Sequence, residues 1–185
     1  MSKVPNFLTI SRIILLPLLA FFIINDSQFN ALWSIFLFFL ISATDFFDGY
    51  IARKLNTTSH FGKMLDPIAD KLFVTVMIII FIYTRDIEGY SVIAGTLIIL
   101  REIFISGLRE YAASSNANIL EVSKLGKYKT ATQILSLFII LISTSFSSLE
   151  ISYPLGIGLL WIATAMSLIS AYKYYNAVFN QDLTN

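Results

Sequence analysis

Apolar residues run through this chain in six long blocks, and short polar stretches separate them. The blocks lie at about residues 5–24, 30–54, 62–84, 89–114, 126–147 and 152–178. Each is close to the ~20 helical residues that cross the hydrocarbon core of a bilayer. Because every connection is short, neighbouring helices are expected to be antiparallel in one bundle. The pattern predicts an all-α integral membrane protein with six transmembrane helices and a single domain over residues 1–185.

The first block could also be the apolar core of a signal peptide. Arg12 interrupts it, however, and Pro17 lies at its centre. No small-x-small cleavage site precedes Asn25. We therefore expect the block to be retained as the first membrane helix.

The composition agrees with this pattern and excludes several kinds of site. Hydrophobic residues make up 56% of the 185 residues, and the mean hydropathy is +0.74, whereas a soluble domain is about 45–50% apolar. A net charge of +1 provides no general attraction to nucleic acid, so no nucleic-acid partner is expected. The absence of cysteine excludes disulfides, thiolate zinc sites and cysteine nucleophiles.

Lys and Arg residues are distributed unevenly between the two expected membrane faces. If the N-terminus is cytoplasmic, the outer loops contain only one basic residue, Arg85, of the thirteen in the chain. Cytoplasmic segments of membrane proteins carry the excess of Lys and Arg. We therefore expect both termini in the cytoplasm, and the connection from Arg53 to Gly62 on the cytoplasmic face.

Four aspartates stand in the strongly apolar second and third blocks: Asp45, Asp48, Asp66 and Asp70. A carboxylate at the centre of a membrane helix costs about 2.5–3.5 kcal/mol on insertion scales, and such residues are usually functional. Asp45 precedes Arg53 by eight residues, which is about 12 Å along a helix. The carboxylates are therefore expected in the cytoplasmic leaflet, in a water-filled cavity open to the cytoplasm.

The spacing of the aspartates places them on two helix faces. Asp45 and Asp48 are three residues apart, and Asp66 and Asp70 are four apart, so each pair shares one side of a helix. Two antiparallel helices can direct both faces to a common point. Carboxylate oxygens suit Mg²⁺ or Mn²⁺. The alternative is that these carboxylates only pair with nearby Lys and Arg side chains, but four of them on two converging faces favour a metal site.

The full motif, D-x2-D-G-x2-A-R-x8-G-x3-D-x3-D over residues 45–70, resembles the signature of the CDP-alcohol phosphotransferase family. The resemblance implies a six-helix membrane enzyme, often dimeric, that transfers a phosphatidyl group from a CDP-linked lipid to an alcohol and releases CMP. It also implies metal binding by Asp45, Asp48, Asp66 and Asp70, with Asp70 acting in addition as the general base. The residues implied to surround the cytidine diphosphate are Gly49, Ala52, Arg53 and Gly62.

A second set of polar residues concerns the acceptor alcohol. Glu102, Ser106 and Arg109 have the spacing of one helix face, and they form a polar stripe in the fourth block. The basic residues expected near the cytoplasmic side in the fourth and fifth blocks are Arg101, Arg109, Lys127 and Lys129. One interpretation is that these cations extend toward lipid headgroups and have no other role. Their convergence favours instead an anionic acceptor that carries its own phosphate.

Three segments resemble, more narrowly, the bacterial branch of the family that makes phosphatidylglycerophosphate: Pro5–Arg12, Arg101–Glu110, and Gly126–Thr130 with Gln133. This implies CDP-diacylglycerol and glycerol 3-phosphate as substrates, in the cytoplasmic membrane of a bacterium, with the active site facing the cytoplasm and a homodimeric assembly. Alternatives are another acceptor (inositol phosphate, serine or phosphatidylglycerol), a membrane prenyltransferase, or a divalent-cation transporter. The nearly uncharged outer halves of the blocks disfavour a transporter.

Two local questions stay open in the sequence. Asn6, Thr9 and Arg12 could line the nucleotide pocket, but we expect them to anchor the first helix at the inner membrane surface. Pro67 could be the first residue of a helix or lie inside a longer one.

Overall fold

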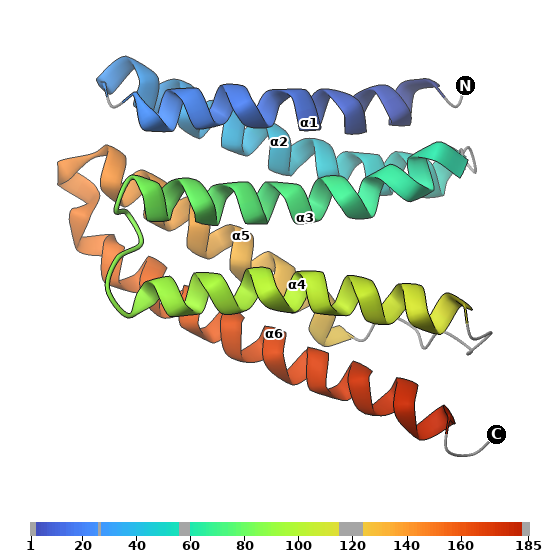
Figure 1. The fold of residues 1–185 in the computed structure, drawn as a ribbon. Helices are drawn as coiled ribbons and strands as arrows, with labels where there is room; N and C mark the ends of the chain where they lie inside the picture. The colour runs from blue at the N-terminus through green and yellow to red at the C-terminus, as the bar shows by residue number, and fades with distance from the viewer. Residues whose placement is uncertain (1–2, 26, 56–59, 115–123, 183–185) are drawn as a thin grey trace. The chain divides into compact units, whose positions relative to one another are not determined.

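The computed structural model of the protein is almost entirely helical in the part of the chain that it describes, residues 3–25, 27–55, 60–114 and 124–182 (Figure 1). The helices are α1 (Lys3–Ile24), α2 (Gln28–Leu55), α3 (His60–Tyr83), α4 (Ser91–Ser114), α5 (Lys124–Ser145), the 3₁₀ helix η1 (Ser147–Ser152) and α6 (Tyr153–Asp182). Each of the six apolar blocks therefore forms one α-helix, and the all-α prediction is confirmed.

The chain divides into two compact units. The first comprises residues 1–86 and 140–151, and the second comprises residues 87–139 and 152–185. α5 contributes its last turns to the first unit and the rest to the second. A single domain over residues 1–185 stays a prediction.

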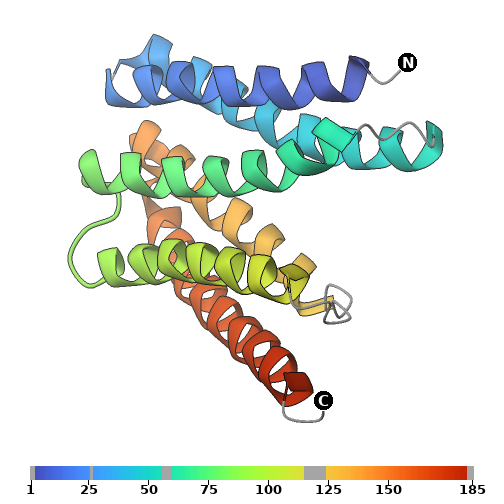
Figure 2. The same ribbon diagram turned by 45° about the vertical axis from the view of Figure 1, so that its right-hand side comes forward.

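The first unit is built on α1, which packs against both α2 and α3. These three helices lie side by side in both ribbon views (Figure 1, Figure 2). Phe38 of α2 and Phe73 of α3 contribute a ring pair with centroids 5.0 Å apart. The largest side chains that are almost fully buried in this unit are Leu19, Phe38, Ile41, Met77, Ile78, Phe81, Ile140 and Leu141.

The second unit is built on the pairing of α4 with α6. Small residues lie at its buried positions, including Ala94 and Ala163, as is usual where helix backbones approach closely. Hydroxyl groups join the helices as well. Thr164 Oγ1 donates to the Ala94 carbonyl at 3.3 Å, and Ser136 Oγ of α5 donates to the Gly156 carbonyl of α6 at 2.8 Å.

Local sequence explains where several helices begin and end. Ser27 caps α2, because its Oγ accepts a hydrogen bond from the Asn30 backbone N–H at 3.2 Å. The turn between α3 and α4 contains two residues with positive φ, Arg85 at 65° and Gly89 at 55°. Glycine adopts this conformation without cost, whereas arginine rarely does. Pro17 lies inside α1, and Pro67 lies within α3 rather than at its start.

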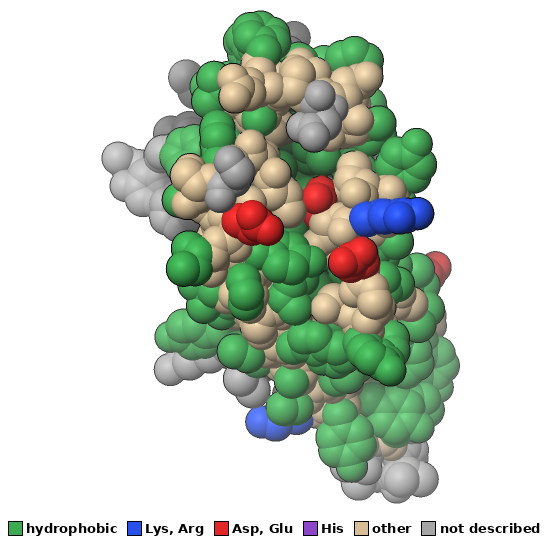
Figure 3. Space-filling model, turned by 90° about the vertical axis from the view of Figure 1, so that its left-hand side faces the viewer, with side chains coloured by type: hydrophobic (Ala, Val, Ile, Leu, Met, Phe, Trp, Pro, Cys, Tyr) green, Lys and Arg blue, Asp and Glu red, His purple; other side chains and the backbone are tan. Residues whose placement is uncertain are grey.

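Large apolar side chains are exposed along the helices of both units. Ile14 is 67% exposed, Phe39 65% and Ile103 66%. Hydrophobic side chains also cover much of the face in Figure 3. Within the described residues, two helical segments are long and apolar enough to cross a membrane, Ser91–Ser114 and Ser148–Phe179, and shorter apolar helices span Thr9–Ile24 and Gln28–Thr44. Six membrane spans, and the orientation of the termini, stay predictions.

Two adjacent isoleucines of α3 provide a matched test of this packing. Ile78 is fully buried and Ile79 is 54% exposed. Ile78→Ala should lower the free energy of unfolding by about 2–5 kcal/mol, because the surrounding side chains close only part of the cavity. Ile79→Ala should cost about 1 kcal/mol or less. Equal shifts in a denaturant or thermal unfolding experiment in one detergent would contradict this placement of α3.

Candidate active site

The aspartate motif occupies two consecutive helices, as its spacing predicts. Asp45 and Asp48 lie in α2, and Asp66 and Asp70 lie in the first half of α3. Asp70 is the member whose side chain the structure describes. The side chains of the other predicted motif residues lie outside the described part, namely Asp45, Asp48, Gly49, Ala52, Arg53, Gly62 and Asp66. Their roles therefore stay predictions.

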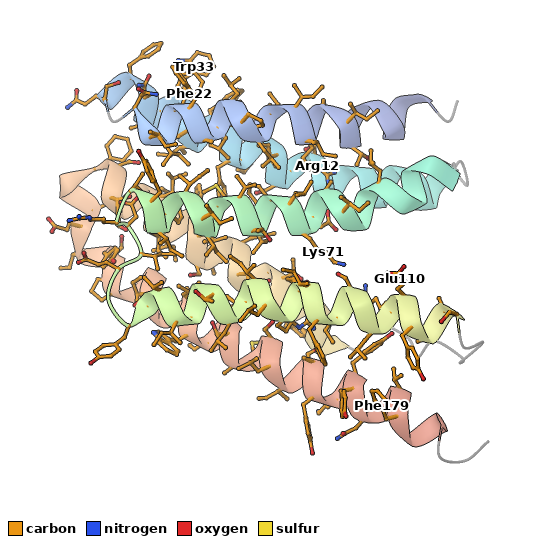
Figure 4. All side chains as sticks on the ribbon, in the orientation of Figure 1. Arg12, Phe22, Trp33, Lys71, Glu110 and Phe179 are labelled. Atoms are coloured by element: carbon orange, nitrogen blue, oxygen red, sulfur yellow. The ribbon has the colours of Figure 1, made fainter. Side chains whose placement is uncertain are left out.

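Asp70 is paired with an arginine from a different helix. Its Oδ1 accepts a hydrogen bond from Nη1 of Arg12 at 3.1 Å. The Arg12 side chain is only 2% exposed, whereas that of Asp70 is 46% exposed. Figure 4 shows Arg12 on α1, the helix that packs against α3. The carboxylate is thus held by a buried cation on one side and is accessible to solvent on another.

This pair changes the interpretation of the first helix. A surface anchor needs a side chain that reaches the headgroups, but Arg12 is almost fully buried and Thr9 is completely buried. The expectation that Asn6, Thr9 and Arg12 anchor α1 at the inner membrane surface is wrong for Thr9 and Arg12 for this reason, and the Asn6 side chain lies outside the described part. Arg12 instead compensates a carboxylate 58 residues later in the chain, and such charge-assisted hydrogen bonds are among the stronger ones in proteins.

The residues of the motif have the chemistry of a site for a hard divalent cation. The predicted donors are all carboxylates, which suits Mg²⁺ or Mn²⁺ rather than Zn²⁺. Asp70 is exposed enough for a group from solvent to reach it. Among the described residues, no three His, Cys, Asp or Glu side chains cluster, but three of the four predicted ligands lie outside that set. The donor set therefore fits the metal.

The second unit contains a buried ion cluster. Oε1 of Glu102 accepts hydrogen bonds from Arg101 Nη1 at 3.0 Å and from Lys129 Nζ. The side chains of Arg101, Glu102 and Lys129 are 9%, 13% and 6% exposed. Arg101 also donates through Nε to the Ser167 carbonyl at 3.2 Å and through Nη2 to Ser170 Oγ at 3.3 Å. Residues of α4, α5 and α6 are thus joined by one cluster with two cations and one anion.

The remaining basic residues differ in accessibility. Arg109 is exposed, and its guanidinium carbon lies 6.0 Å from the ring centroid of Tyr174, a distance typical of a cation–π contact. The Lys127 side chain lies outside the described part. Ser106 Oγ donates to the Glu102 carbonyl at 2.7 Å. Of the predicted acceptor-binding residues, Arg101 and Lys129 thus lie together, because both contact Glu102.

A cavity of about 290 Å³ lies in the first unit, away from Asp70. It is lined by residues at the end of α1, the start of α2, the end of α3 and the end of α5, including Phe22, Ser34, Thr84 and Thr144. Asp70 lies in the first half of α3, more than two helical turns from that lining. We do not assign a substrate to this cavity, because it contains none of the predicted site residues.

The sequence profile of the family described as CDP-alcohol phosphatidyltransferase matches residues 2–169. The chain belongs to this family. The match includes the whole aspartate motif, Arg12, and the basic residues of α4 and α5. The family resemblance of the motif is thereby confirmed.

Curated relatives match nearly the whole chain. A protein of Rickettsia typhi is 41% identical over 178 residues, which cover 96% of this chain and 97% of the relative. A protein of Rickettsia felis is 42% identical, with 95% of each chain covered. An Arabidopsis thaliana protein is 36% identical, with 95% of this chain and 79% of the relative covered. All three are named CDP-diacylglycerol–glycerol-3-phosphate 3-phosphatidyltransferase, the plant protein as number 2, which confirms the narrower resemblance.

The sequence alone did not identify the residues in other helices that pair with Arg12 and Glu102. Arg12 was the one cation of the apolar block at residues 5–24, and Glu102 was a member of a polar stripe without an assigned role. A charge within a strongly apolar segment indicates a buried partner, and both residues lie in such segments. The identity of the partner depends on which helices pack together.

The Arg12–Asp70 pair can be measured with a double-mutant cycle. Arg12→Met, Asp70→Asn and the double variant should give a coupling energy of about 1–3 kcal/mol in unfolding experiments, because both partners contribute to one charge-assisted bond. The matched control combines Asp70→Asn with Ile14→Ala, since Ile14 is exposed on the same helix, and should be additive. A coupling energy near zero for the first pair would show that the two side chains do not interact.

Proposed function

We propose that this protein is a phosphatidylglycerophosphate synthase. It transfers the phosphatidyl group of CDP-diacylglycerol to glycerol 3-phosphate. The terminal hydroxyl oxygen of the acceptor forms a bond to the lipid-proximal phosphorus, and the bond from that phosphorus to the CMP oxygen breaks. The products are CMP and phosphatidylglycerophosphate.

The observation that carries the proposal is the combination of a complete motif with full-length relatives. All eight fixed motif positions of residues 45–70 are filled. Relatives that are 41–42% identical, and aligned over nearly their whole length, are named for this transfer. The ion cluster of the second unit supports an anionic acceptor, because it contains more positive than negative charge.

The aspartates would perform the chemistry at the lipid pyrophosphate. Asp45, Asp48, Asp66 and Asp70 would hold Mg²⁺ or Mn²⁺, which would neutralise the pyrophosphate charge and stabilise the leaving CMP. Asp70 would in addition accept the proton of the attacking hydroxyl. Arg12 keeps the Asp70 carboxylate in place from the neighbouring helix. Gly49, Ala52, Arg53 and Gly62 would contact the cytidine diphosphate.

The basic residues of the second unit would bind the phosphate of glycerol 3-phosphate. Arg109 is exposed and can reach a ligand from solvent, and a guanidinium can donate two parallel hydrogen bonds to a phosphate. Lys129 and Arg101 add positive charge, and Lys127 belongs to the same motif. This assignment gives each member of the basic set a function.

The protein would act from within the cytoplasmic membrane of a bacterium. Large apolar side chains are exposed along the helices, and contiguous apolar surface of this kind mostly faces lipid or a partner in native proteins. We propose six spans, cytoplasmic termini and an active site that faces the cytoplasm. A homodimer, which the family resemblance implies, belongs to the same proposal.

The reaction itself is the direct test. Purified protein with CDP-diacylglycerol, labelled glycerol 3-phosphate and Mg²⁺ should release CMP and label the lipid, and EDTA should abolish both signals. Asp70→Asn should reduce kcat by about 10³-fold or more, because an amide neither accepts the proton nor binds metal well. Glu110→Gln, an exposed carboxylate of α4, is the control and should leave the rate unchanged. Absence of metal-dependent CMP release with every alcohol tested would refute the proposal.

The acceptor assignment has a test of its own. Arg109→Ala should raise KM for glycerol 3-phosphate by about tenfold or more, because a hydrogen bond to a charged group is worth about 1.5–3 kcal/mol. KM for CDP-diacylglycerol should not change. Lys173→Ala is the matched control, since Lys173 is an exposed cation of α6 with no proposed role. An unchanged KM for glycerol 3-phosphate in Arg109→Ala would point to an acceptor without a phosphate.

A further inference from the structure

Glu102 is the charged residue of the polar stripe to which neither the motif nor the proposed function gives a role. It lies in the middle of α4, and its side chain is 13% exposed. An ionised carboxylate at such a position is costly unless it is paired. Its location between two predicted phosphate-binding cations is therefore informative.

Both cations meet the same oxygen of Glu102. Oε1 accepts from Arg101, the preceding residue of α4, and from Lys129 of α5. The carboxylate thus bridges cations from two helices. Arg101 is restrained further, because Nε and Nη2 donate to Ser167 and Ser170 of α6. A lysine side chain has four rotatable bonds and three interchangeable donors, so its ammonium position depends on the partner that it contacts.

The charges of the cluster are unequal. One carboxylate faces two buried cations, which leaves one unit of positive charge, and the exposed Arg109 lies two helical turns further along α4. Near the cluster, Gln133 follows Lys129 by one turn and is only 2% exposed. Its Nε2 has no acceptor among the described residues. The cluster is therefore rich in donors and in positive charge.

We propose that Glu102 is a positioning residue for the acceptor phosphate. Its carboxylate fixes the Lys129 ammonium beside the Arg101 guanidinium and offsets one of their two charges, so that the remaining charge is available to an anionic acceptor. Glu102 itself does not touch the substrate. This inference rests on the proposed function, and it adds the group that arranges the cations.

In the opposite role, the Glu102 carboxylate would compete with the acceptor phosphate for the two cations. If Glu102 only occupied the cations in place of the acceptor, its removal would free them and strengthen acceptor binding. If Glu102 were only a structural link between helices, its removal would reduce the fraction of folded enzyme. That would lower the maximum rate without changing KM. The three roles therefore differ in the direction of the change in KM.

The experiment compares Glu102→Gln with wild type in the transfer assay. We expect KM for glycerol 3-phosphate to rise about tenfold, because the amide cannot compensate two adjacent cations and its NH₂ group cannot accept from either of them. The change in kcat should stay within about threefold, and KM for CDP-diacylglycerol should be unchanged. Glu110→Gln, the same substitution at an exposed position of α4, is the matched control and should behave as wild type.

Glu102→Asp is the second variant, and it tests the positioning role of Glu102 if Glu102→Gln does not fold. It keeps the charge, but its side chain is one methylene shorter and reaches the two cations less well. KM for glycerol 3-phosphate should rise by about threefold, between wild type and Glu102→Gln. An unchanged or lower KM in either folded variant would overturn the proposal. A wild-type protein that transfers nothing to glycerol 3-phosphate would instead refute the proposed function, so the two failures are distinguishable.

Discussion

Pairing of charge between apolar helices is the constraint on which both units of this protein depend. A membrane-embedded arginine or carboxylate is costly by itself, and each additional helix that supplies a counter-charge lowers that cost. In the first unit, Arg12 of α1 meets Asp70 of α3. In the second, Glu102 of α4 meets Arg101 of the same helix and Lys129 of α5. Each pairing joins neighbouring helices at specific faces, and Asp70, Arg101 and Lys129 are among the residues proposed to act in phosphatidyl transfer.

The two pairings serve the proposed chemistry in different ways. The Asp70 carboxylate is about half exposed, while its arginine partner is buried. The arginine therefore orients the carboxylate from the protein interior, and the carboxylate remains reachable from solvent. The side chains of the ion cluster at Glu102 are at most 13% exposed, so the cluster determines where positive charge lies. Orientation of a reactive group by residues that do not themselves react is a general way in which active sites keep their geometry.

The sequence predicts the helices well and their partners poorly. The first block, at about 5–24, became α1, Lys3–Ile24, and the fourth, at about 89–114, became α4, Ser91–Ser114. Apolar periodicity and polar breaks carry this information locally. The Arg12–Asp70 contact joins residues 58 positions apart. Spacing within one helix identifies side chains that share a face, as with Glu102 and Ser106, but it does not identify which helix packs on that face.

The buried Arg12 also bears on how such a chain is assembled in a membrane. If α1 spans the bilayer as proposed, it leaves the ribosome before α3, so its arginine enters the bilayer before the carboxylate partner has been synthesised. An arginine at the centre of a lone helix costs about 2.5–3.5 kcal/mol on insertion scales, and Pro17 gives α1 a further local irregularity. With that topology, the Arg12–Asp70 pair would stabilise the first helix only after the third has been synthesised, and insertion of α1 to α3 would be a cooperative step.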